Sequence, residues 1–355
     1  MELSDREKAI VAYLEKSGGP QRVSGVYVAL REKFGASRRT IIRDLQHIVA
    51  VGAVVQSGGG RTTSYAIVPS RRALMPLDVE RYFAQSPSER HTRGWFDESV
   101  FDIFTGELFT KEERERLDTL NARYHETRRT LERESPAILR RELDRLVIEL
   151  SWKSSEIEGN TYTLLETEAL IKDHELARGK DKAEAQMILN HKAALDYIFA
   201  HSAEFAPINT AKIVHIHSIL AGGLGITEGF RNHPVGIIGT IYRPPGNERS
   251  IATAMDRLVA TLASLQDPFA QALALLAMIA YIQPFEDGNK RTSRIMANAV
   301  LSVAGASMLS YRSVEVSEYR KAMILFYEQN NIAYLKRIFL DQFEFAVNNY
   351  FAGDA

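Results

Sequence analysis

The sequence predicts a mainly α-helical protein with a small N-terminal module that combines helices and a β-hairpin. Residues 269–282 are apolar on every face apart from Gln271, which is typical of the buried central helix of an α-bundle. Most of the chain after residue 110 has the helical spacing of apolar residues. By contrast, "GAVVQSGGGRTTSYAIV" at residues 52–68 holds two alternating runs around a glycine-rich turn, which predicts a hairpin.

The composition is that of an ordinary soluble globular protein. Of 355 residues, 45% are apolar and 25% charged, and 44 Lys or Arg against 45 Asp or Glu give a net charge of -1. With this balance the net charge of the chain does not attract nucleic acid or a membrane surface. Such a partner would have to bind a local patch of basic residues. The absence of cysteine excludes disulfides and thiolate chemistry. With no signal-peptide pattern and no apolar run long enough to span a bilayer, we expect a cytoplasmic protein without a membrane partner.

Residues 1–70 predict a winged helix-turn-helix domain. Apolar residues mark the inner faces of three helices: Ile10, Val11 and Leu14; Val26, Leu30 and Phe34; Ile41, Leu45 and Ile48. Ser37 is the expected N-cap of the third helix, and the hairpin at residues 52–68 follows it as the wing. Residues 71–110 are expected to form a linker or docking segment, and residues 111–355 a helical domain.

The third helix of this module is the expected DNA-recognition helix. Residues 1–70 carry ten Lys or Arg and six Asp or Glu, a net charge of +4 on a nearly neutral chain. The residues expected to contact DNA are Ser37, Arg38, Arg39, Thr40 and Arg43 on the helix and Arg61 at the wing tip. A winged helix usually reads DNA as a dimer, so we expect a homodimer. Alternatively, the module is a protein-interaction or dimerisation domain whose arginines are merely solvated.

The segment "YIQPFEDGNKRTSR", residues 281–294, combines a helix end with a polar cluster. Pro284 disfavours helical geometry at Gln283, so the apolar helix ends there, and a new helix is expected to begin near Gly288 or Asn289. The free N–H groups and the dipole of a helix N-terminus favour phosphate.

Basic side chains and an acid complete this predicted anion site. Arg291 and Arg294 project from one side of the first turns and suit a polyphosphate, and Asp287 is placed to hold Mg²⁺ beside it. The residues expected to bind the phosphate groups are Gly288, Asn289, Lys290, Arg291 and Arg294. The alternative is a capped helix with surface salt bridges.

The segment resembles the motif H-P-F-x-D/E-G-N-G-R-x-x-R of the Fic family, whose members mostly transfer AMP from ATP to hydroxyl groups of target proteins. The matching residues are Pro284, Phe285, Asp287, Gly288, Asn289, Arg291 and Arg294. Gln283 stands in the position of the histidine, and Lys290 in that of the second glycine. The resemblance covers roughly residues 95–345.

Two further stretches carry the resemblance. "SSEIEGN" is similar to the inhibitory motif S/T-x-x-x-E-G/N, with Ser154, Glu158 and Gly159 in register near the end of a helix over residues 145–160. The resemblance implies that Glu158 pairs with Arg294 and obstructs the γ-phosphate, as in the intramolecularly inhibited class. "GFRNHPVGIIGTIYRPP" is similar to the β-hairpin flap that positions a target segment, with the expected flap residues Val235, Gly236, Ile237 and Tyr242.

Gln283 decides what activity to expect. In the family the histidine accepts the proton of the attacking hydroxyl, whereas an amide can orient a hydroxyl but cannot accept its proton. We therefore expect a nucleotide site with weak or absent AMP transfer to a protein target or to the protein itself. Three explanations are open: a pseudoenzyme that reports nucleotide to its winged helix, another base such as His233, or an introduced substitution. Lys290 also leaves phosphate transfer of the Doc type open, although Arg294 favours the usual nucleotide orientation.

Overall fold

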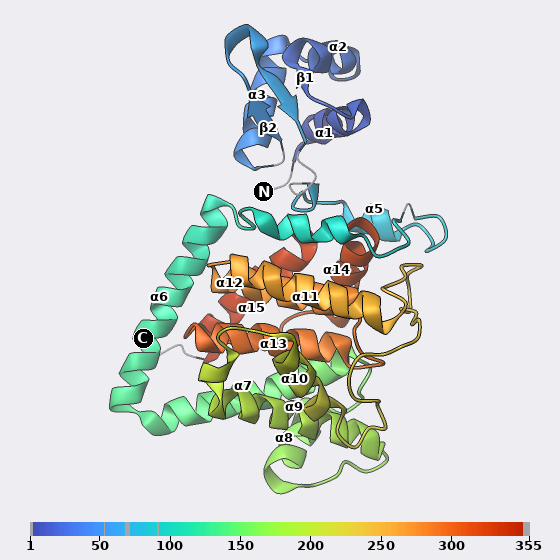
Figure 1. The fold of residues 1–355 in the computed structure, drawn as a ribbon. Helices are drawn as coiled ribbons and strands as arrows, with labels where there is room; N and C mark the ends of the chain where they lie inside the picture. The colour runs from blue at the N-terminus through green and yellow to red at the C-terminus, as the bar shows by residue number, and fades with distance from the viewer. Residues whose placement is uncertain (1–2, 53, 68–71, 91, 351–355) are drawn as a thin grey trace.

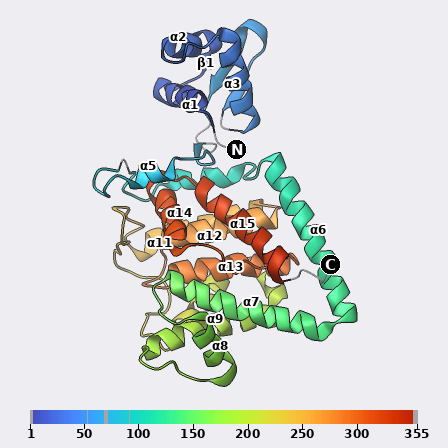
Figure 2. The same ribbon diagram turned by 180° about the vertical axis from the view of Figure 1, so that it is seen from behind.

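Two bodies of unequal size make up the protein, and a segment running along the larger one joins them (Figures 1 and 2). The computed structural model describes residues 3–52, 54–67, 72–90 and 92–350, without the side chains of Glu15 and Arg61. The predicted mainly helical fold is confirmed: helices dominate, and the named strands lie in the N-terminal body. Within the described residues, no helix combines the length and apolar character needed to cross a membrane.

Three helices and a small sheet form the N-terminal body. Its elements are α1 (Asp5–Ser17), β1 (Gln21–Arg22), α2 (Val23–Phe34), α3 (Arg38–Ala50), β2 (Val55–Ser57), the 3-10 helix η1 (Gly60–Thr62) and β3 (Ser64–Ala66). The strands are antiparallel in the order β1-β3-β2, with Tyr65 of β3 opposite Gln21 and Gln56. These are the elements on which the winged-helix prediction rests, and the assignment stays a prediction.

Helix α3 packs against the other helices of the N-terminal body through apolar contacts and one ion pair. Ile41, Leu45 and Ile48 are completely buried in the small core. On the same helix, the buried carboxylate of Asp44 pairs with Arg6 of α1 through two hydrogen bonds. Because this pair pins α3 to α1 on the inner side, the other face of α3 points outward.

The larger body is a helical bundle. Its elements are η2 (Glu98–Thr105), α6 (Lys111–Glu134), α7 (Pro136–Ile157), α8 (Leu164–Asp173), α9 (Lys182–Ala200), η3 (Ser202–Phe205), α10 (Thr210–Ala221), α11 (Glu248–Ser264), α12 (Pro268–Ile282), α13 (Asn289–Val303), α14 (Val316–Gln329) and α15 (Ala333–Tyr350). The long helix α6 runs along one side of it in both ribbon views (Figures 1 and 2).

Helix α12 is the centre of the bundle. Apart from Gln271, its residues from Phe269 to Ile282 are buried, as the apolar run predicts. The helix starts where Asp267 accepts hydrogen bonds from the N–H groups of Phe269 and Ala270, and it ends before Pro284. Helix α13 packs directly against α12, so the turn between them is held on both sides by the core.

The joining segment is bound to the bundle rather than free. It contains the short helix α5 (Val79–Phe83). Ala73 O accepts a 2.7 Å hydrogen bond from Ile332 N, and the Tyr82 hydroxyl donates a 2.7 Å bond to Glu328 of α14. Met75, beyond the expected domain boundary at residue 70, packs into the small N-terminal core. We call residues 72–97 the strap; residue 91 lies outside the described part.

The predicted β-hairpin flap is wrong. Across residues 222–247, the backbone forms no strand, and Arg243 makes only an isolated bridge with Trp95 of the strap. Proline and glycine residues interrupt any ladder here, and Tyr242 is buried with its hydroxyl donating to Tyr281 O at 2.9 Å. Val235, Gly236 and Ile237 therefore lie in an irregular loop.

Candidate active site

The turn between α12 and α13 is closed by the side chain of Asn289. Its Nδ2 donates to Phe285 O at 2.9 Å and to Gln283 Oε1 at 3.0 Å, while its Oδ1 accepts from Phe285 N at 2.9 Å. Asn289 is 4% exposed, so these bonds form away from water and fix the path of the turn. The sequence suggests Asn289 only through the motif; its role in closing the turn is visible in the structure alone.

Gln283 is a structural part of this turn. Its backbone is left-handed, with φ 51°, and Pro284 disfavours a further right-handed helical residue at this position. Its Nε2 donates to Ala280 O at 2.7 Å, and its Oε1 accepts from Asn289. Both ends of the amide are thus bound to the protein, and the side chain is 8% exposed.

Helix α13 begins at Asn289, within the predicted region, with Gly288 as its N-cap. Gly288 has φ 81°, and a Cβ there would lie 3.3 Å from Arg291 Nη2 and 3.5 Å from His217 Cδ2. Only glycine fits this close approach without strain. Because glycine brings no capping side chain, the N–H groups of the first turn face outward as a positive helix end.

His217 of α10 supports the turn from below. Its ring stacks on Phe285 with centroids 3.7 Å apart, and Nε2 lies 3.0 Å from Asp287 O, to which it donates as the neutral Nε2–H tautomer. Burial lowers the pKa of His217. The hydrogen bond to Asp287 O acts in the opposite direction, and the charge of Arg291 adds to the lowering. His217 therefore has a structural role next to the turn.

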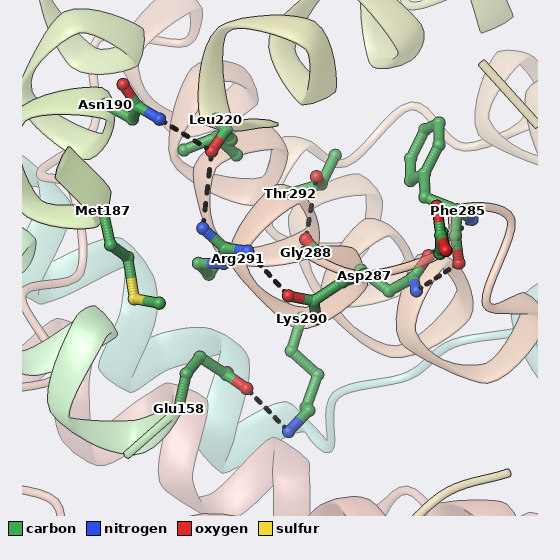
Figure 3. Close-up of polar contacts among 12 residues, drawn as sticks. Glu158, Met187, Asn190, Leu220, Phe285, Asp287, Gly288, Lys290, Arg291 and Thr292 are labelled. Carbon is green, nitrogen blue, oxygen red and sulfur yellow. Dashed lines mark hydrogen bonds and ion pairs between the residues drawn. The ribbon is translucent and has the colours of Figure 1, made fainter. Parts of the chain in front are cut away.

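Arg291 is buried beside the exposed carboxylate of Asp287. The guanidinium Nη2 lies 3.2 Å from Asp287 Oδ2, and Nη1 donates to Leu220 O at 3.4 Å (Figure 3). Arg291 is 1% exposed, whereas the Asp287 side chain is 69% exposed. Asp287 therefore keeps an open carboxylate at the surface of the site. A single carboxylate fits Mg²⁺, which takes one or two from protein and the rest from phosphate and water.

Arg294 is held by the end of α7. Its Nε donates to Ser154 Oγ at 2.8 Å, and its Nη2 donates to Ser154 O at 2.9 Å and to Glu158 Oε1 at 2.7 Å. Helix α7 ends at Ile157, and Glu158 is its C-cap, followed by Gly159 with φ 99°. The structure thus brings Ser154 and Glu158 onto the same arginine, 140 and 136 residues away along the chain.

Glu158 also binds Lys290. The Nζ of Lys290 lies 2.8 Å from Glu158 Oε2 (Figure 3). Because Arg294 binds Oε1, the two carboxylate oxygens hold two different cations. Burial by itself would raise the pKa of Glu158, but Arg294 and Lys290 outweigh it and lower that pKa to about 2. The carboxylate is therefore charged throughout the physiological range and occupies the cationic side of the site.

Two residues near the site escaped the sequence analysis. Arg231 is 3% exposed and donates to Gln283 O at 2.7 Å, to His233 O at 2.5 Å and to Pro245 O at 2.6 Å. Its hydrogen bonds thereby hold both ends of loop 231–245, near His233 and at Pro245, to the turn after α12. His191 of α9 is completely buried, and burial together with Arg291 and Arg294 lowers its pKa well below the usual value. Neither has a sequence spacing that would single it out.

The predicted DNA-contacting residues lie together on α3. Arg38, Arg39 and Arg43 are exposed, while Ser37 caps the helix by accepting from Thr40 N at 3.2 Å. Ser37 Oγ also lies 2.9 Å from Thr40 Oγ1, so these hydroxyls are partly used within the helix. The side chain of Arg61 lies outside the described part of the chain.

Part of the larger body matches a known protein family. Residues 207–301, which contain the turn and the start of α13, match the model of the Fic/DOC family. This segment is similar to the Fic/DOC domain. The expected resemblance to this family is therefore confirmed for the segment that carries the motif.

Curated relatives match about half of this chain. The protein adenylyltransferase Fic of Drosophila erecta is 32% identical over 176 residues, which is 48% of this chain and 35% of the relative. That of Drosophila melanogaster is 31% identical over 175 residues, 48% of this chain and 36% of the relative. The chain thus spans about a third of the length of the curated relatives that it matches.

Solved structures share the fold. A Fic-domain-containing signaling protein from Bacteroides thetaiotaomicron aligns with TM-score 0.54 and 21% identity over 66% of this chain and 96% of its own. A Fic-1 fragment from C. elegans aligns with TM-score 0.54 and 20% identity, covering 67% of this chain and 72% of its own. At such low identity these matches establish the fold of the larger body and nothing finer.

Proposed function

We propose that this protein is a self-inhibited nucleotide-binding protein of the Fic type, in which Gln283 leaves AMP transfer weak or absent. The observation that carries the proposal is the pairing of Glu158 with Arg294 at 2.7 Å. A carboxylate on that guanidinium occupies the position that a phosphate oxygen would take, and it excludes the phosphate by both charge and volume. In the closed form the protein holds its own acid in place of the ligand.

ATP would bind with its phosphates over the start of α13. The first-turn N–H groups from Asn289 onward, together with Lys290, Arg291 and Arg294, are the groups that would hold the phosphates. Asp287, with its open carboxylate, would hold Mg²⁺, which neutralises phosphate charge when bound. For Arg294, binding requires Glu158 to leave.

Gln283 has neither the chemistry nor the freedom of a general base. Its amide lacks a basic nitrogen, and both ends of it are bound to Ala280 and Asn289. His233, the alternative base, is exposed, with Nδ1 3.3 Å from Asn232 Oδ1. We therefore favour a nucleotide-binding protein with little transfer over an enzyme that uses His233.

The test is ATP binding by calorimetry in the full chain and in Glu158→Gly. Release of Arg294 is expected to strengthen ATP binding by at least about tenfold, which corresponds to 1.4 kcal/mol. Glu156→Gly is the matched control, because Glu156 lies on the same helix end but pairs with Lys153. Absence of ATP binding in Glu158→Gly would refute the nucleotide site. Rapid transfer from α-³²P-ATP by the unchanged protein would refute the inactive, self-inhibited state.

A second candidate function is DNA binding by the N-terminal body, as a transcriptional regulator with a nucleotide-responsive or dimerising Fic core. It is supported by the exposed arginines Arg38, Arg39 and Arg43 on the outward face of α3. Reversal of these charges to Glu should weaken binding to a palindromic site and flatten its salt dependence. Reversal of Arg31 and Lys33, exposed on α2, is the control. Equal loss from both sets would indicate non-specific attraction only.

The remaining parts of the proposal concern organisation and partners. We propose a division into residues 1–70, 71–110 and 111–355, a homodimer formed for DNA binding, a protein target or self-modification, and a cytoplasmic location. Analytical ultracentrifugation with and without palindromic DNA tests the dimer. A monomer bound to one half-site would contradict it.

A further inference from the structure

The strap holds the outer side of loop 231–245. Arg90 of the strap, 5% exposed, donates from Nη2 to Gly239 O in the loop at 2.6 Å. The backbones are also joined: Arg243 N donates to Gly94 O at 3.0 Å, and Phe96 N donates to Arg243 O at 3.0 Å. The guanidinium of Arg243 lies 5.4 Å from the ring of Trp95, which is 66% exposed.

The strap is itself anchored at a buried carboxylate. Glu328 of α14 is completely buried and accepts a 2.7 Å hydrogen bond from the Tyr82 hydroxyl, while Arg90 Nη1 lies 3.4 Å from its Oε2. Arg93 N further donates to Glu328 O at 3.0 Å. One guanidinium, that of Arg90, therefore links the bundle, the strap and the loop.

The loop needs this external support. Cross-strand pairing is absent across the described residues 222–247, and Ile238 and Ile241 are 99% and 51% exposed. At the base Arg231 holds the loop to the active-site turn, and at the outer side the contacts to the strap hold it. A segment with few hydrogen bonds of its own opens easily once its supports are removed.

We propose that Arg90 is a positioning residue that holds loop 231–245 in place beside the active-site turn. This dependence of the loop on Arg90 does not rest on the proposed function. Met75 of the strap packs into the core of the N-terminal body, so the strap contacts both the loop and the module that would bind DNA or another partner. An event that displaces the strap also frees the loop.

The test is amide hydrogen exchange in the full chain with Arg90→Lys. Lysine keeps a cation beside Glu328, but a single ammonium cannot reproduce the guanidinium fork that also reaches Gly239. Exchange across residues 239–243 should accelerate by about tenfold or more, while α12 and α13 stay protected. Tyr82→Phe is the matched control, since it removes a hydrogen bond to the same Glu328 without touching the loop.

Unchanged exchange in Arg90→Lys, or equal acceleration in Tyr82→Phe, would overturn the proposal. Trp95→Ala is a second variant that spares the core and should loosen residues 239–243 to a smaller degree. In Trp152→Phe, Trp95 is the remaining tryptophan, and its fluorescence emission should shift when Arg90→Lys is added. An unchanged emission would contradict the link between Arg90 and the loop.

ATP affinity should be equal in Glu158→Gly with and without Arg90→Lys. Loss of ATP binding in Glu158→Gly alone would count against the proposed function and leave the exchange result intact.

Discussion

Lys290 Nζ lies 2.8 Å from Glu158 Oε2, on the carboxylate whose other oxygen binds Arg294. In the Fic motif a glycine stands where this lysine does. The chain therefore has a second cation on Glu158, and that cation comes from the same helix N-terminus that would bind phosphate. When Glu158 leaves, Lys290 can bind a phosphate group in place of the Glu158 carboxylate.

Lys290→Gln should have opposite effects in two backgrounds. In the otherwise unchanged chain it weakens the hold on Glu158 and should raise ATP affinity, roughly two- to fivefold because the lysine is partly exposed. In Glu158→Gly it removes a phosphate ligand and should lower ATP affinity by a similar factor. Calorimetric titration of the four proteins measures both. Lys153→Gln, whose lysine pairs with Glu156, serves as the control, and effects of equal sign in both backgrounds would contradict the exchange of partners.

Gln283→His in the Glu158→Gly protein should restore AMP transfer. An imidazole supplies the missing base, so label transfer from α-³²P-ATP should rise by roughly 10²- to 10⁴-fold over Glu158→Gly alone. The rise should follow deprotonation of a group with a pKa near neutrality. Gln271→His, on the same helix α12 but away from the turn, should give no gain. Bound ATP without any gain would show that more than the base is missing.

The ion pair between Glu158 and Arg294 should be insensitive to pH in the physiological range. The pKa of Glu158 is about 2 in the closed form, below its ordinary value of 4.5. A depressed carboxylate pKa contributes stability that is complete above the ordinary value and is lost as the pH falls toward the depressed one. ATP affinity should thus show no change from Glu158 between roughly pH 6 and pH 8, a range that lies well above both pKa values. Strong activation on mild acidification, absent in Glu158→Gly, would contradict the assignment.

Asn289→Ala should damage both stability and ligand binding. It removes the side-chain hydrogen bonds to Phe285 and Gln283 and should cost roughly 1–3 kcal/mol in the free energy of unfolding. Asn298→Ala is the matched control: Asn298 is completely buried on the same helix and bonds both backbone groups of Leu309. Chemical denaturation should report similar losses for the two, while ATP binding should fall only in Asn289→Ala. Equal ATP binding in both would show that the turn does not depend on Asn289.

The parts of the fold that the sequence predicts are those set by local rules. Pro284 ends α12 and the motif glycine begins α13, because each constrains the backbone at its own position. The buried face of α12 follows from its apolar run. The same rules predict the helical faces of the N-terminal body.

The parts that could not be predicted depend on distant residues. Loop 231–245 has β-type residues, but its shape is set by Arg90 and by the burial of Tyr242 against Tyr281. The pairing of Lys290 with Glu158 joins residues from two helices, and no spacing in the sequence indicates it. The resemblance to the family predicted the partner of Arg294, whereas the lysine departs from the family pattern and its contact appears only in the folded chain.

The left-handed backbone at position 283 bears on whether evolution could place a histidine there. Histidine is among the residues enriched at positive φ, whereas glutamine is not, and Gln283 has a φ of 51°. The main chain at this point therefore suits an imidazole better than the amide it carries. Codons for the two amino acids differ only in their third nucleotide, so the scaffold lies one point mutation away from a side chain that it is already shaped to accept.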